Sequence, residues 1–262
     1  MTEARMTEAS VLFEAEGPVA RITLNRPARR NAIDGAAAAG LAEALARFEA
    51  DPDLRVAVLC GAGPVFCAGM DLAAFGAGQV EAVLFGPGGF AGLTEARRTK
   101  PLIAAVHGAA LAGGCELALA CDMIVAEEGS RFGLPEVIRG LVAGAGGALR
   151  LASVIAPARA REILLTGRMV DTAEAWDLGL IARRAEPGAG LAVALELARE
   201  IAANAPLAVA ETLRLSRAAE AAQLAALWPE NARTLRAIMD SEDAQEGARA
   251  FLERRAPVWQ GR

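Results

Sequence analysis

The chain contains a single histidine, His107, and its four cysteines form no paired CxxC motif. Common zinc sites need several Cys and His ligands, so this composition excludes them. Cys115 and Cys121 lie in apolar segments, which is typical of small buried thiols. The sequence therefore predicts no zinc centre.

Basic residues are outnumbered by acidic ones, and Lys100 is the only lysine. The 27 basic and 32 acidic residues give a formal net charge of −5 and an isoelectric point near 5.2. Proteins that bind nucleic acid need a basic surface to neutralise phosphates. The charge balance therefore argues against nucleic acid as a partner.

Long uninterrupted apolar runs are missing as well. The most apolar region is broken by His107, Glu116 and Asp122, so no segment is a convincing membrane span. The first nine residues are polar and acidic, unlike a signal peptide. We expect residues 1–10 to form the disordered tail of a cytoplasmic protein that does not enter a membrane.

The chain does have enough apolar material for a large core, and residues 101–147 contain a distinctive order of short elements. Of its 262 residues, 54% are hydrophobic, which suits one large domain or a domain with an appendage. A buried strand at 102–106 precedes a small-residue turn at 108–114, and a second strand follows at 122–126. Apolar runs bounded by Gly and Pro are typical of buried strands.

Glu116 is out of place in this pattern. It follows Gly113-Gly114 in the apolar helical segment 115–120, where packing favours Ala or Leu. An ionised carboxylate is seldom buried without a partner or a task. A helix start preceded by glycines also exposes free backbone N–H groups, which suit an anion, including one formed only in a transition state.

Glu136 follows Pro135, and the helix, strand and loop between it and Glu116 can return it to the same site. Two carboxylates together can manage a water molecule, one as the base and the other as the acid or orienter. The residues alone leave other interpretations open. Gly113-Gly114 can serve close packing, and both glutamates can be helix-start charges, with Glu136 facing solvent.

The N-terminal part predicts a β-hairpin with strands at 11–16 and 19–24, followed by a helix capped by Asp34. A buried strand at 55–60 then leads into Gly61-Ala62-Gly63. A dinucleotide-binding turn would need a third glycine at position 66, where this chain has phenylalanine. A Rossmann fold is therefore not favoured.

Several further elements are predicted on either side of the central stretch. Glycine-rich residues 76–92 indicate a loop or short helices, and residues 95–100 are typical of the exposed end of a helix. Later in the chain we expect a helix at 157–166, a helix capped by Asp171 and a strand at 180–183.

From residue 191 onward the pattern is helical, with segments at 191–203, 206–220, 224–239 and 241–255. We therefore divide the chain into an α/β core at 11–190, which holds the active site, and a C-terminal helical region at 191–262. This region carries more apolar residues than it can bury alone. We expect its exposed face to pack against other subunits.

Seven motifs occur in a fixed order along the chain. They are Asn25-Arg26-Pro27 with Asn31-Ala32; Phe66-Cys67-Ala68-Gly69-Met70-Asp71-Leu72; Pro101 to Gly108; Gly113-Gly114-Cys115-Glu116 with Cys121-Asp122; Phe132-Gly133-Leu134-Pro135-Glu136; Gly144-Ala145-Gly146-Gly147; and Leu165-Thr166-Gly167. Each motif is weak alone, but the seven together are specific, and the resemblance that they carry extends over about residues 11–259. In this order they resemble the crotonase family, the enoyl-CoA hydratases and isomerases.

The resemblance implies an α/β fold, a spiral of repeated strand–strand–helix units with a C-terminal helical oligomerisation region. That region would assemble a homotrimer, or a hexamer made of two trimers. By position, Met70 and Gly113 match the residues whose backbone N–H groups form the oxyanion hole for the thioester oxygen. Glu116 and Glu136 match the two catalytic glutamates of the hydratases, and the presence of both favours hydration.

Contacts to the coenzyme A thioester are implied in the same way. The matching positions are Arg29, Ala68, Asp71, Leu72, Arg254 and Arg255. The last two match a basic pair that relatives place near the coenzyme A phosphates of an adjacent subunit, although cations at a helix end are favourable without a ligand. The chain departs from the family pattern at Ala143, where relatives often have proline, and at Ala73-Ala74, where a lysine is frequent.

The reaction implied is addition of water across the double bond of a 2-enoyl-CoA to give a 3-hydroxyacyl-CoA. Coenzyme A would enter with the substrate, and no metal, nicotinamide or other cofactor is expected. A double-bond isomerase and a non-catalytic acyl-CoA-binding protein are the alternatives. A serine protease of the same fold is not favoured, since His107 falls at a strand end where the family usually has asparagine.

Overall fold

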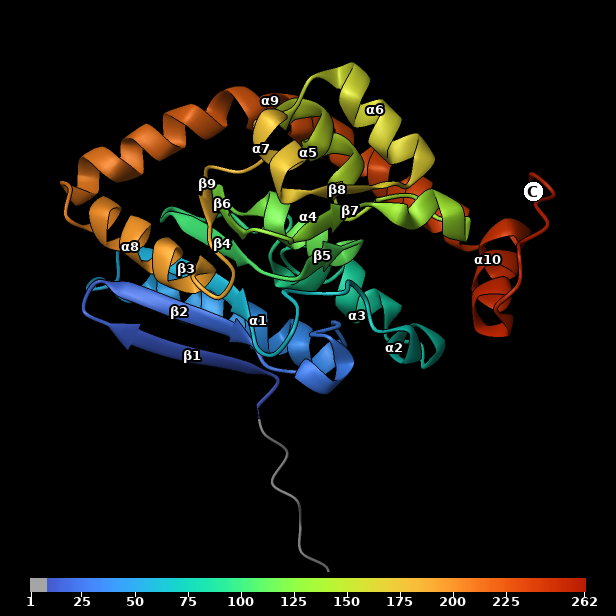
Figure 1. Ribbon diagram of the computed structural model, residues 1–262, viewed down its shortest axis with the longest axis horizontal. Coiled ribbons are helices and arrows are strands. Elements are labelled where there is room, and N and C mark those ends of the chain that lie inside the picture. Colours follow the sequence, from blue (N-terminus) through green and yellow to red (C-terminus); the bar gives the residue numbers. More distant parts are fainter. Residues whose placement is uncertain (1–8) are drawn as a thin grey trace, which may run out of the picture.

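The computed structural model describes residues 9–262, apart from the side chains of Phe75 and of residues 219–225. Residues 1–8, most of the predicted tail, lie outside the described residues. The larger sheet of the described chain has six strands in the order β1-β2-β3-β4-β6-β9 (Figure 1). Their bounds are β1 Val11–Glu16, β2 Val19–Leu24, β3 Val56–Gly61, β4 Leu102–Val106, β6 Met123–Glu127 and β9 Arg183–Ala185.

Strands β1 and β2 form the predicted hairpin. They pair antiparallel, with Val11 opposite Leu24 and Glu16 opposite Val19. Gly17 turns the chain between them at a φ of +56°, a conformation that glycine adopts at little cost. The pairs from β2 to β9 are all parallel, so each connection must cross the sheet and can place a helix on its face.

A smaller sheet contains β5 (Ala109–Leu111), β7 (Arg131–Gly133) and β8 (Met169–Asp171). The prediction of a turn over residues 108–114 is therefore wrong for β5, which pairs in parallel with β7. The buried backbone groups of this small-residue run need hydrogen-bond partners. Strand β7 supplies some of them, and Cys67 supplies the others through bonds to Ala109 and Leu111.

The two sheets are linked by a repeating order of elements. β4 and β5 are followed by helix α4 (Gly113–Ala120), and β6 and β7 are followed by the 3-10 turn η3 (Pro135–Arg139) and helix α5 (Gly147–Val154). In each repeat the first strand joins the large sheet and the second joins the small sheet. This arrangement confirms the predicted strand–strand–helix units.

Helix α1 (Gly35–Ala50) begins where the sequence predicts, because the carboxylate of Asp34 accepts a hydrogen bond from the N–H of Ala37 at 2.9 Å. Short helices also occur in and beside the glycine-rich segment, as predicted. They are α2 (Leu72–Gly76), α3 (Val80–Leu84) and the 3-10 turn η2 (Phe90–Gly92).

The prediction of a helix end at residues 95–100 is wrong, since this segment has no helix. The backbone N–H groups of Thr99 and Lys100 donate to the carboxylate of Glu49 on α1. The Nζ of Lys100 also donates to the carbonyl groups of Phe48 and Asp51. These bonds to the end of α1 replace the bonds that a local helix would make.

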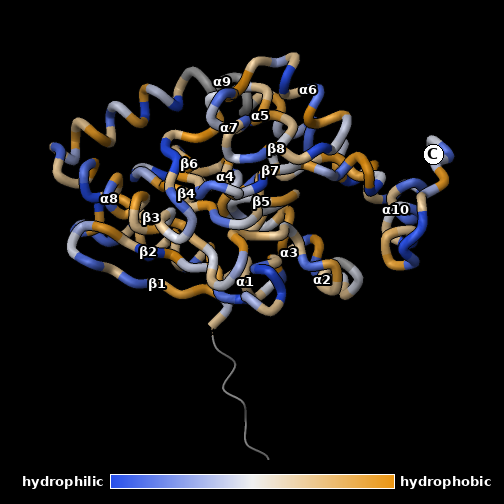
Figure 2. The backbone as a smooth tube through the Cα atoms, viewed as in Figure 1, coloured by the Kyte–Doolittle hydropathy of each residue, from blue (hydrophilic) through white to orange (hydrophobic). Residues whose placement is uncertain are grey.

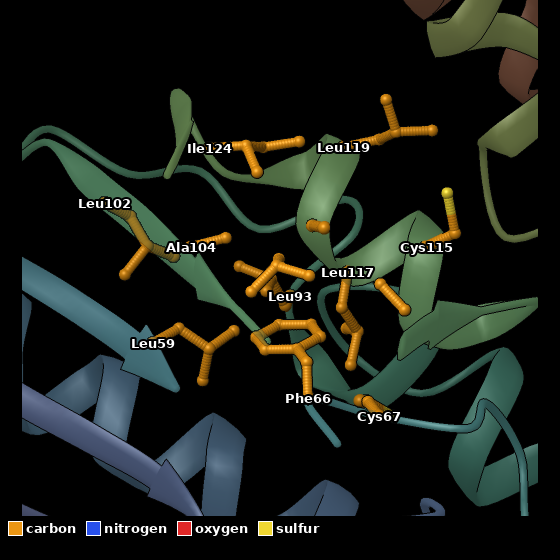
Figure 3. Close-up of a cluster of buried hydrophobic side chains, with 14 of the residues drawn as sticks. Leu59, Phe66, Cys67, Leu93, Leu102, Ala104, Cys115, Leu117, Leu119 and Ile124 are labelled. Atoms are coloured by element: carbon orange, nitrogen blue, oxygen red, sulfur yellow. The ribbon is translucent and has the colours of Figure 1, made fainter. Parts of the chain in front are cut away.

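The main core lies between the large sheet and helices α1 and α4. Figure 3 shows Leu59 of β3 and Leu117 of α4 on either side of Phe66, with Leu102 of β4 in the same cluster. All four side chains are fully buried, and burial of each stabilises the fold by about 2 kcal/mol. The core therefore anchors α4, the helix that begins at Gly113 and carries Glu116.

All four cysteines are free thiols, and three of them are buried while Cys121 is half-buried. Burial raises the pKa of every one of these thiols. For Cys67 and Cys121 burial raises the pKa to about 12. Thiols of this kind are packing groups rather than nucleophiles.

The C-terminal half agrees with several sequence predictions and departs from two. Helices α6 (Pro157–Thr166) and α7 (Thr172–Asp177) form where expected, and the carboxylate of Asp171 accepts from the N–H of Glu174. Strand β9 begins at Arg183, three residues after the start predicted for it. A single helix, α9 (Pro206–Met239), replaces the two helices predicted at 206–220 and 224–239. Leu224, at the second predicted start, is among the residues whose side chains are not described.

Helix α8 (Gly190–Ala202) belongs to the packing of the large sheet, where Ala194 and Leu197 form a second core cluster with Val58 and Ile103. Helix α9 runs from the end beside α8, over the smaller sheet, to α10 (Glu242–Glu253) on the other side of the molecule (Figure 1). Its tube alternates between hydrophilic and hydrophobic colours in Figure 2. Among the described residues, no helix is long and apolar enough to cross a membrane.

Candidate active site

The two predicted glutamates lie on segments that begin at the same edge of the small sheet. Strands β5 and β7 are parallel neighbours, so the segments that follow them start side by side. Helix α4 follows β5 and carries Glu116, and η3 follows β7 and carries Glu136. Both side chains are buried, with 3% and 9% of their surface exposed. The fold thus brings together two carboxyl groups that the sequence separates by a helix and two strands.

Glu116 is held by the start of the next helix. Its Oε1 accepts a hydrogen bond from the backbone N–H of Gly147 at 2.8 Å, and Gly147 is the first residue of α5. A carboxylate at a helix start is favoured by the helix dipole. Burial nevertheless dominates and raises the pKa of Glu116 to about 7, while the amides of Gly147 and Ala145 and the charge of Arg150 act to lower it.

Glu136 has a different environment. Its Oε2 atom is buried and has no hydrogen-bond partner among the described residues. Burial, followed by the negative charge of Glu116, raises the pKa of Glu136 to about 9. Because each charge disfavours the other, the two groups lose their protons at different pH values, and Glu116 is the better placed to be ionised first. An unsatisfied buried oxygen of this kind suits a bound water or substrate.

The segment that contains Met70 is held in an extended pairing with Ile33. The N–H of Ile33 donates to the carbonyl of Gly69, and the N–H of Asp71 donates to the carbonyl of Ile33, both at 2.8 Å. In this parallel bridge the N–H of Met70 points the other way, and it has no acceptor among the described residues. Met70 therefore presents one free backbone donor.

Gly113 presents the second donor. As the first residue of α4, its N–H has no acceptor in the helix, and none occurs elsewhere among the described residues. The segments of the two donors touch, since a Cβ at Gly69 would lie 3.0 Å from the nitrogen of Gly113. A Cβ at Gly113 would lie 2.6 Å from the ring of Phe90, so any larger residue would require this buried ring to move.

The two N–H donors and the two carboxyl groups form one site, because α4 carries one donor and one carboxyl group. Gly113 and Glu116 share its first turn, Met70 adjoins it, and Glu136 interacts electrostatically with Glu116. Two aligned N–H groups can stabilise negative charge on an oxygen, and two coupled carboxyls can remove one proton and deliver another. Sequence reasoning therefore selected groups that the fold brings together.

The carboxylate of Asp71 is occupied by hydrogen bonds within the protein. Its carboxylate accepts from Arg26 at 3.0 Å, from Arg29 at 3.2 Å and from the N–H of Ala73 at 2.9 Å. These bonds, with hydrogen bonding to Ala73 the strongest cause of lowering, outweigh burial and lower the pKa of Asp71. The side chain of Arg29 remains 57% exposed. Asp71 thus orients Arg29, which stays free to reach solvent.

The other predicted substrate contacts lie in two places. Leu72 is 60% exposed beside Asp71, and Ala68 is half-buried in the segment before Met70. Arg254 ends α10 in the left-handed conformation, with a φ of +54°. Arg255 forms ion pairs with Glu246 and Glu253 of its own chain. The structure therefore places this basic pair at the C-terminal end of α10.

His107 bonds through Nε2 to the carbonyl of Gly63 at 2.9 Å. It lines a cavity of about 200 Å³ together with Cys60 and Glu127. Among the described residues, no group of three or more His, Cys, Asp or Glu side chains is arranged to hold a metal ion. The prediction that no cofactor is required stays a prediction.

Two parts of the site were not predicted from the sequence. Phe90, which packs against Gly113, lies in a glycine-rich segment that predicts only a loop or short helices. The amide of Gly147 belongs to a motif that the sequence singled out, but the sequence does not show that it binds Glu116. Ala143, the departure from the family pattern, is buried next to Gly147.

Comparisons with known proteins agree with this geometry. The family model described as enoyl-CoA hydratase/isomerase matches residues 14–262. The chain belongs to this family. A carnitinyl-CoA dehydratase of Citrobacter koseri is 43% identical over 263 residues, covering 97% of this chain and 99% of the relative.

Solved structures of the enoyl-CoA hydratase/isomerase family share the fold. A carnitinyl-CoA hydratase from Mycobacterium avium has a TM-score of 0.93 at 41% identity, covering 98% of this chain and 100% of that chain. An enoyl-CoA hydratase from Mycobacterium marinum has a TM-score of 0.79 at 48% identity, covering 97% and 100%. The predicted crotonase fold is therefore confirmed.

Proposed function

We propose that this protein is a hydro-lyase that adds water across the double bond of a 2-enoyl-CoA thioester and produces a 3-hydroxyacyl-CoA. The observation that carries the proposal is the buried, electrostatically coupled pair Glu116 and Glu136 beside two backbone N–H groups that have no acceptor in the described part of the chain. Its relatives are named as hydratases and dehydratases of acyl-CoA compounds, which supports the same reaction class.

The oxyanion hole starts the reaction. The N–H groups of Met70 and Gly113 donate to the thioester oxygen, which withdraws electrons from the double bond and makes the β-carbon electrophilic. Negative charge then collects on that oxygen as the enolate forms, and the same donors stabilise it more strongly than they stabilise the substrate. Only the backbone of Met70 takes part in this step.

The two glutamates handle the protons. The Glu116 carboxylate removes a proton from water, whose oxygen bonds to the β-carbon, and Glu136 gives its proton to the α-carbon. This division of roles follows their environments, because the Gly147 N–H stabilises the Glu116 carboxylate, while the Oε2 atom of Glu136 has no partner among the described residues. One water is added, and the pair keeps one proton in total. No group beyond the chain and its substrate is needed for these transfers.

A second candidate is dehydration of carnitinyl-CoA, the reverse direction on a substrate with a quaternary ammonium group. The names of the relatives from Citrobacter koseri and Mycobacterium avium favour it. The same carboxyl pair serves both directions, since catalysis of a step implies catalysis of its reverse. The difference lies in the acyl group that the pocket accepts.

A homotrimer or a hexamer remains part of the proposal. The C-terminal helices and tail leave several large apolar side chains exposed in a single chain, namely Leu207, Leu215, Leu227, Phe251, Leu252, Val258 and Trp259. Apolar surface of this extent favours burial between subunits. Sedimentation equilibrium would measure the assembly directly, and a monomer would contradict it.

A substrate panel tests the proposed function. Crotonyl-CoA, longer 2-enoyl-CoAs, a 3-enoyl-CoA and carnitinyl-CoA would each be compared by kcat/KM, with product identity checked by mass spectrometry. We expect hydration of at least one 2-enoyl-CoA, or dehydration of carnitinyl-CoA. Conversion of only the 3-enoyl-CoA would identify an isomerase, and binding without turnover of any substrate would identify an acyl-CoA-binding protein.

A further inference from the structure

The two C-terminal helices contact the two segments that hold the catalytic glutamates. Helix α9 touches the turn formed by residues 143–147, whose last residue binds Glu116. Helix α10 touches η3, the segment that carries Glu136. These contacts lie within one subunit, and they bear on where the two carboxyl groups are held.

One polar contact joins α9 to the 143–147 turn. The side-chain amide of Asn231 donates a hydrogen bond to the carbonyl of Gly144 at 2.6 Å. The turn is tight, since the N–H of Gly144 also donates to the carbonyl of Val142 at 2.8 Å. Asn231 therefore holds the chain three residues before the Gly147 amide that binds Glu116.

Apolar side chains on the same face of α9 complete this contact. Leu235 lies one turn beyond Asn231, and a Cβ at Gly144 would lie 2.8 Å from its Cδ1 atom. Trp228 lies one turn before Asn231, and a Cβ at Gly146 would lie 2.6 Å from its ring. The spacing of these residues places them on one helix face. That face fits against glycines because the turn has no side chains there.

Helix α10 makes an equally close contact with η3. A Cβ at Gly247 would lie 2.1 Å from the carbonyl oxygen of Arg139, and a Cβ at Gly140 would lie 2.4 Å from the carbonyl oxygen of Asp243. The guanidinium of Arg139 also stacks over the ring of Phe251, 4.2 Å from its centre. The backbones of α10 and η3 are therefore in direct contact, so a shift of one helix or turn would displace the other.

We propose that Asn231 and Gly247 are positioning residues for the hydration reaction: α9 fixes the turn that binds Glu116, and α10 fixes the segment that carries Glu136. This inference rests on the proposed function. It gives the C-terminal helices a task within each subunit, besides the assembly of subunits. In this role neither residue needs to touch the substrate, since each acts through a carboxyl group.

The consequence for Glu116 is specific. Its carboxylate depends on the Gly147 amide, and its other charged or titratable neighbours are Glu136 on η3, Arg150 on α5 and Cys115 on α4. If the turn loosens, the amide moves away and the ionised form loses a donor. The pKa of Glu116 then rises, and less of the base is ionised at neutral pH.

The experiment compares Asn231→Leu, which keeps the volume but removes the donor, with Asn231→Gln, which retains an amide. Thr234→Ala, at an exposed position of α9, is the control. We would measure kcat and KM for crotonyl-CoA, or for the substrate that the panel identifies. A ¹³C NMR titration of the glutamate carboxyls, with the Glu116 signal assigned by its loss in Glu116→Gln, would follow the carboxyl directly.

For Asn231→Leu we expect kcat to fall on the order of tenfold or more, the effect of a small misplacement of a reacting group. KM should change little, and the Glu116 titration should move to higher pH. Asn231→Gln should recover part of both changes. A folded Asn231→Leu protein with the parent kcat and the parent titration would overturn the inference, and so would equal losses in the two variants.

Gly247→Ala tests the α10 contact, with Ala248→Val on the exposed side of the same helix as its control. We expect Gly247→Ala to lower kcat and the control to leave it unchanged. Circular dichroism would verify folding. Should Gly247→Ala not fold, Phe251→Leu removes the stacking against Arg139 and keeps an apolar side chain for subunit contacts, and its kcat should also fall. If either folded variant kept the parent kcat, the result would contradict the positioning role proposed for α10.

Failure of this inference is separable from failure of the proposed function. If the parent protein converts none of the panel substrates, the proposed function fails. The NMR titrations do not require turnover, so they still show whether Asn231 sets the environment of Glu116.

Discussion

The carboxyl groups of Glu116 and Glu136 share one buried site but have unequal partners. Glu116 accepts the backbone N–H of Gly147, whereas the Oε2 atom of Glu136 has no partner among the described residues. The charge of Glu116 also raises the pKa of Glu136. This asymmetry allows two identical side chains to act as base and acid in one reaction.

The first prediction is a bell-shaped dependence of kcat/KM on pH. The active form has one proton on the pair, and burial raises the two pKa values to about 7 for Glu116 and about 9 for Glu136. Activity should rise as the first proton leaves and fall as the second leaves. Initial rates with crotonyl-CoA across this range would check it. A profile without an alkaline decline would contradict the role of Glu136 as the acid.

A second prediction concerns replacement of each carboxyl by an amide. Glu116→Gln and Glu136→Gln should each lower kcat by roughly 100-fold or more, the scale of general acid–base assistance. A saturated acyl-CoA should bind almost as before, because the oxyanion donors remain. Steady-state kinetics and calorimetry would measure the two effects. An isomerase would instead tolerate the loss of one carboxyl far better than the other.

The third prediction isolates the N–H of Gly113. Gly113→Pro removes this donor, and loss of one oxyanion donor costs on the order of 3 kcal/mol of transition-state stabilisation. Any side chain at this position also meets the Phe90 ring. Gly113→Ala keeps the donor and is therefore the matched control. Equal kcat/KM values for the two folded variants would place the oxyanion hole elsewhere.

Stability should also depend on the glutamate pair. In the unfolded chain both side chains titrate near their ordinary value of 4.5, and burial raises both pKa values in the folded protein. The folded state then binds more protons, so the free energy of unfolding should decrease as pH rises from about 4.5 to about 9. Urea unfolding at several pH values would measure this trend.

Glu136→Gln is the control for the stability measurement, because an amide does not titrate. The parent should lose stability relative to this variant as pH rises through the window. Parallel curves for the two proteins would show that burial of Glu136 does not control the trend.

The fifth prediction concerns Arg254 and Arg255. If they bind the coenzyme A phosphates, the double alanine variant should have a higher KM for acyl-CoA, and a smaller change for a pantetheine thioester that lacks the nucleotide. Arg249→Ala, at an exposed position of α10, is the control. Because Arg255 already pairs with Glu246 and Glu253, equal effects on both substrates would show that the pair only stabilises the end of α10.

Local patterns predicted much of the fold. Elements with a strong local cause form as expected: the hairpin of β1 and β2, the helix capped by Asp34, and α10, whose cap Ser241 accepts from the N–H of Ala244. Each depends on residues a few positions apart. Glu116 could be chosen for a related reason, because a glutamate in an otherwise apolar helix start is anomalous wherever the chain folds, whereas Glu136 is chosen through its spacing from Glu116 and the family resemblance.

Features that depend on distant parts of the chain were not predictable in this way. Strand β5 exists because β7 and Cys67 supply partners, and residues 95–100 follow the end of α1 instead of forming a helix. The bond from Asn231 to Gly144 joins residues 87 positions apart. Periodicity and capping describe neighbours in sequence, and they carry no information about such pairs.

The buried thiols have a practical consequence for spectroscopy. None of the four native cysteines is an exposed, low-pKa nucleophile. A maleimide fluorophore should therefore react with an introduced surface cysteine, such as Ala248→Cys on α10, while the native residues stay in place. Fluorescence from that single label would record, in real time, whether α10 stays docked on η3 while substrate is bound and released.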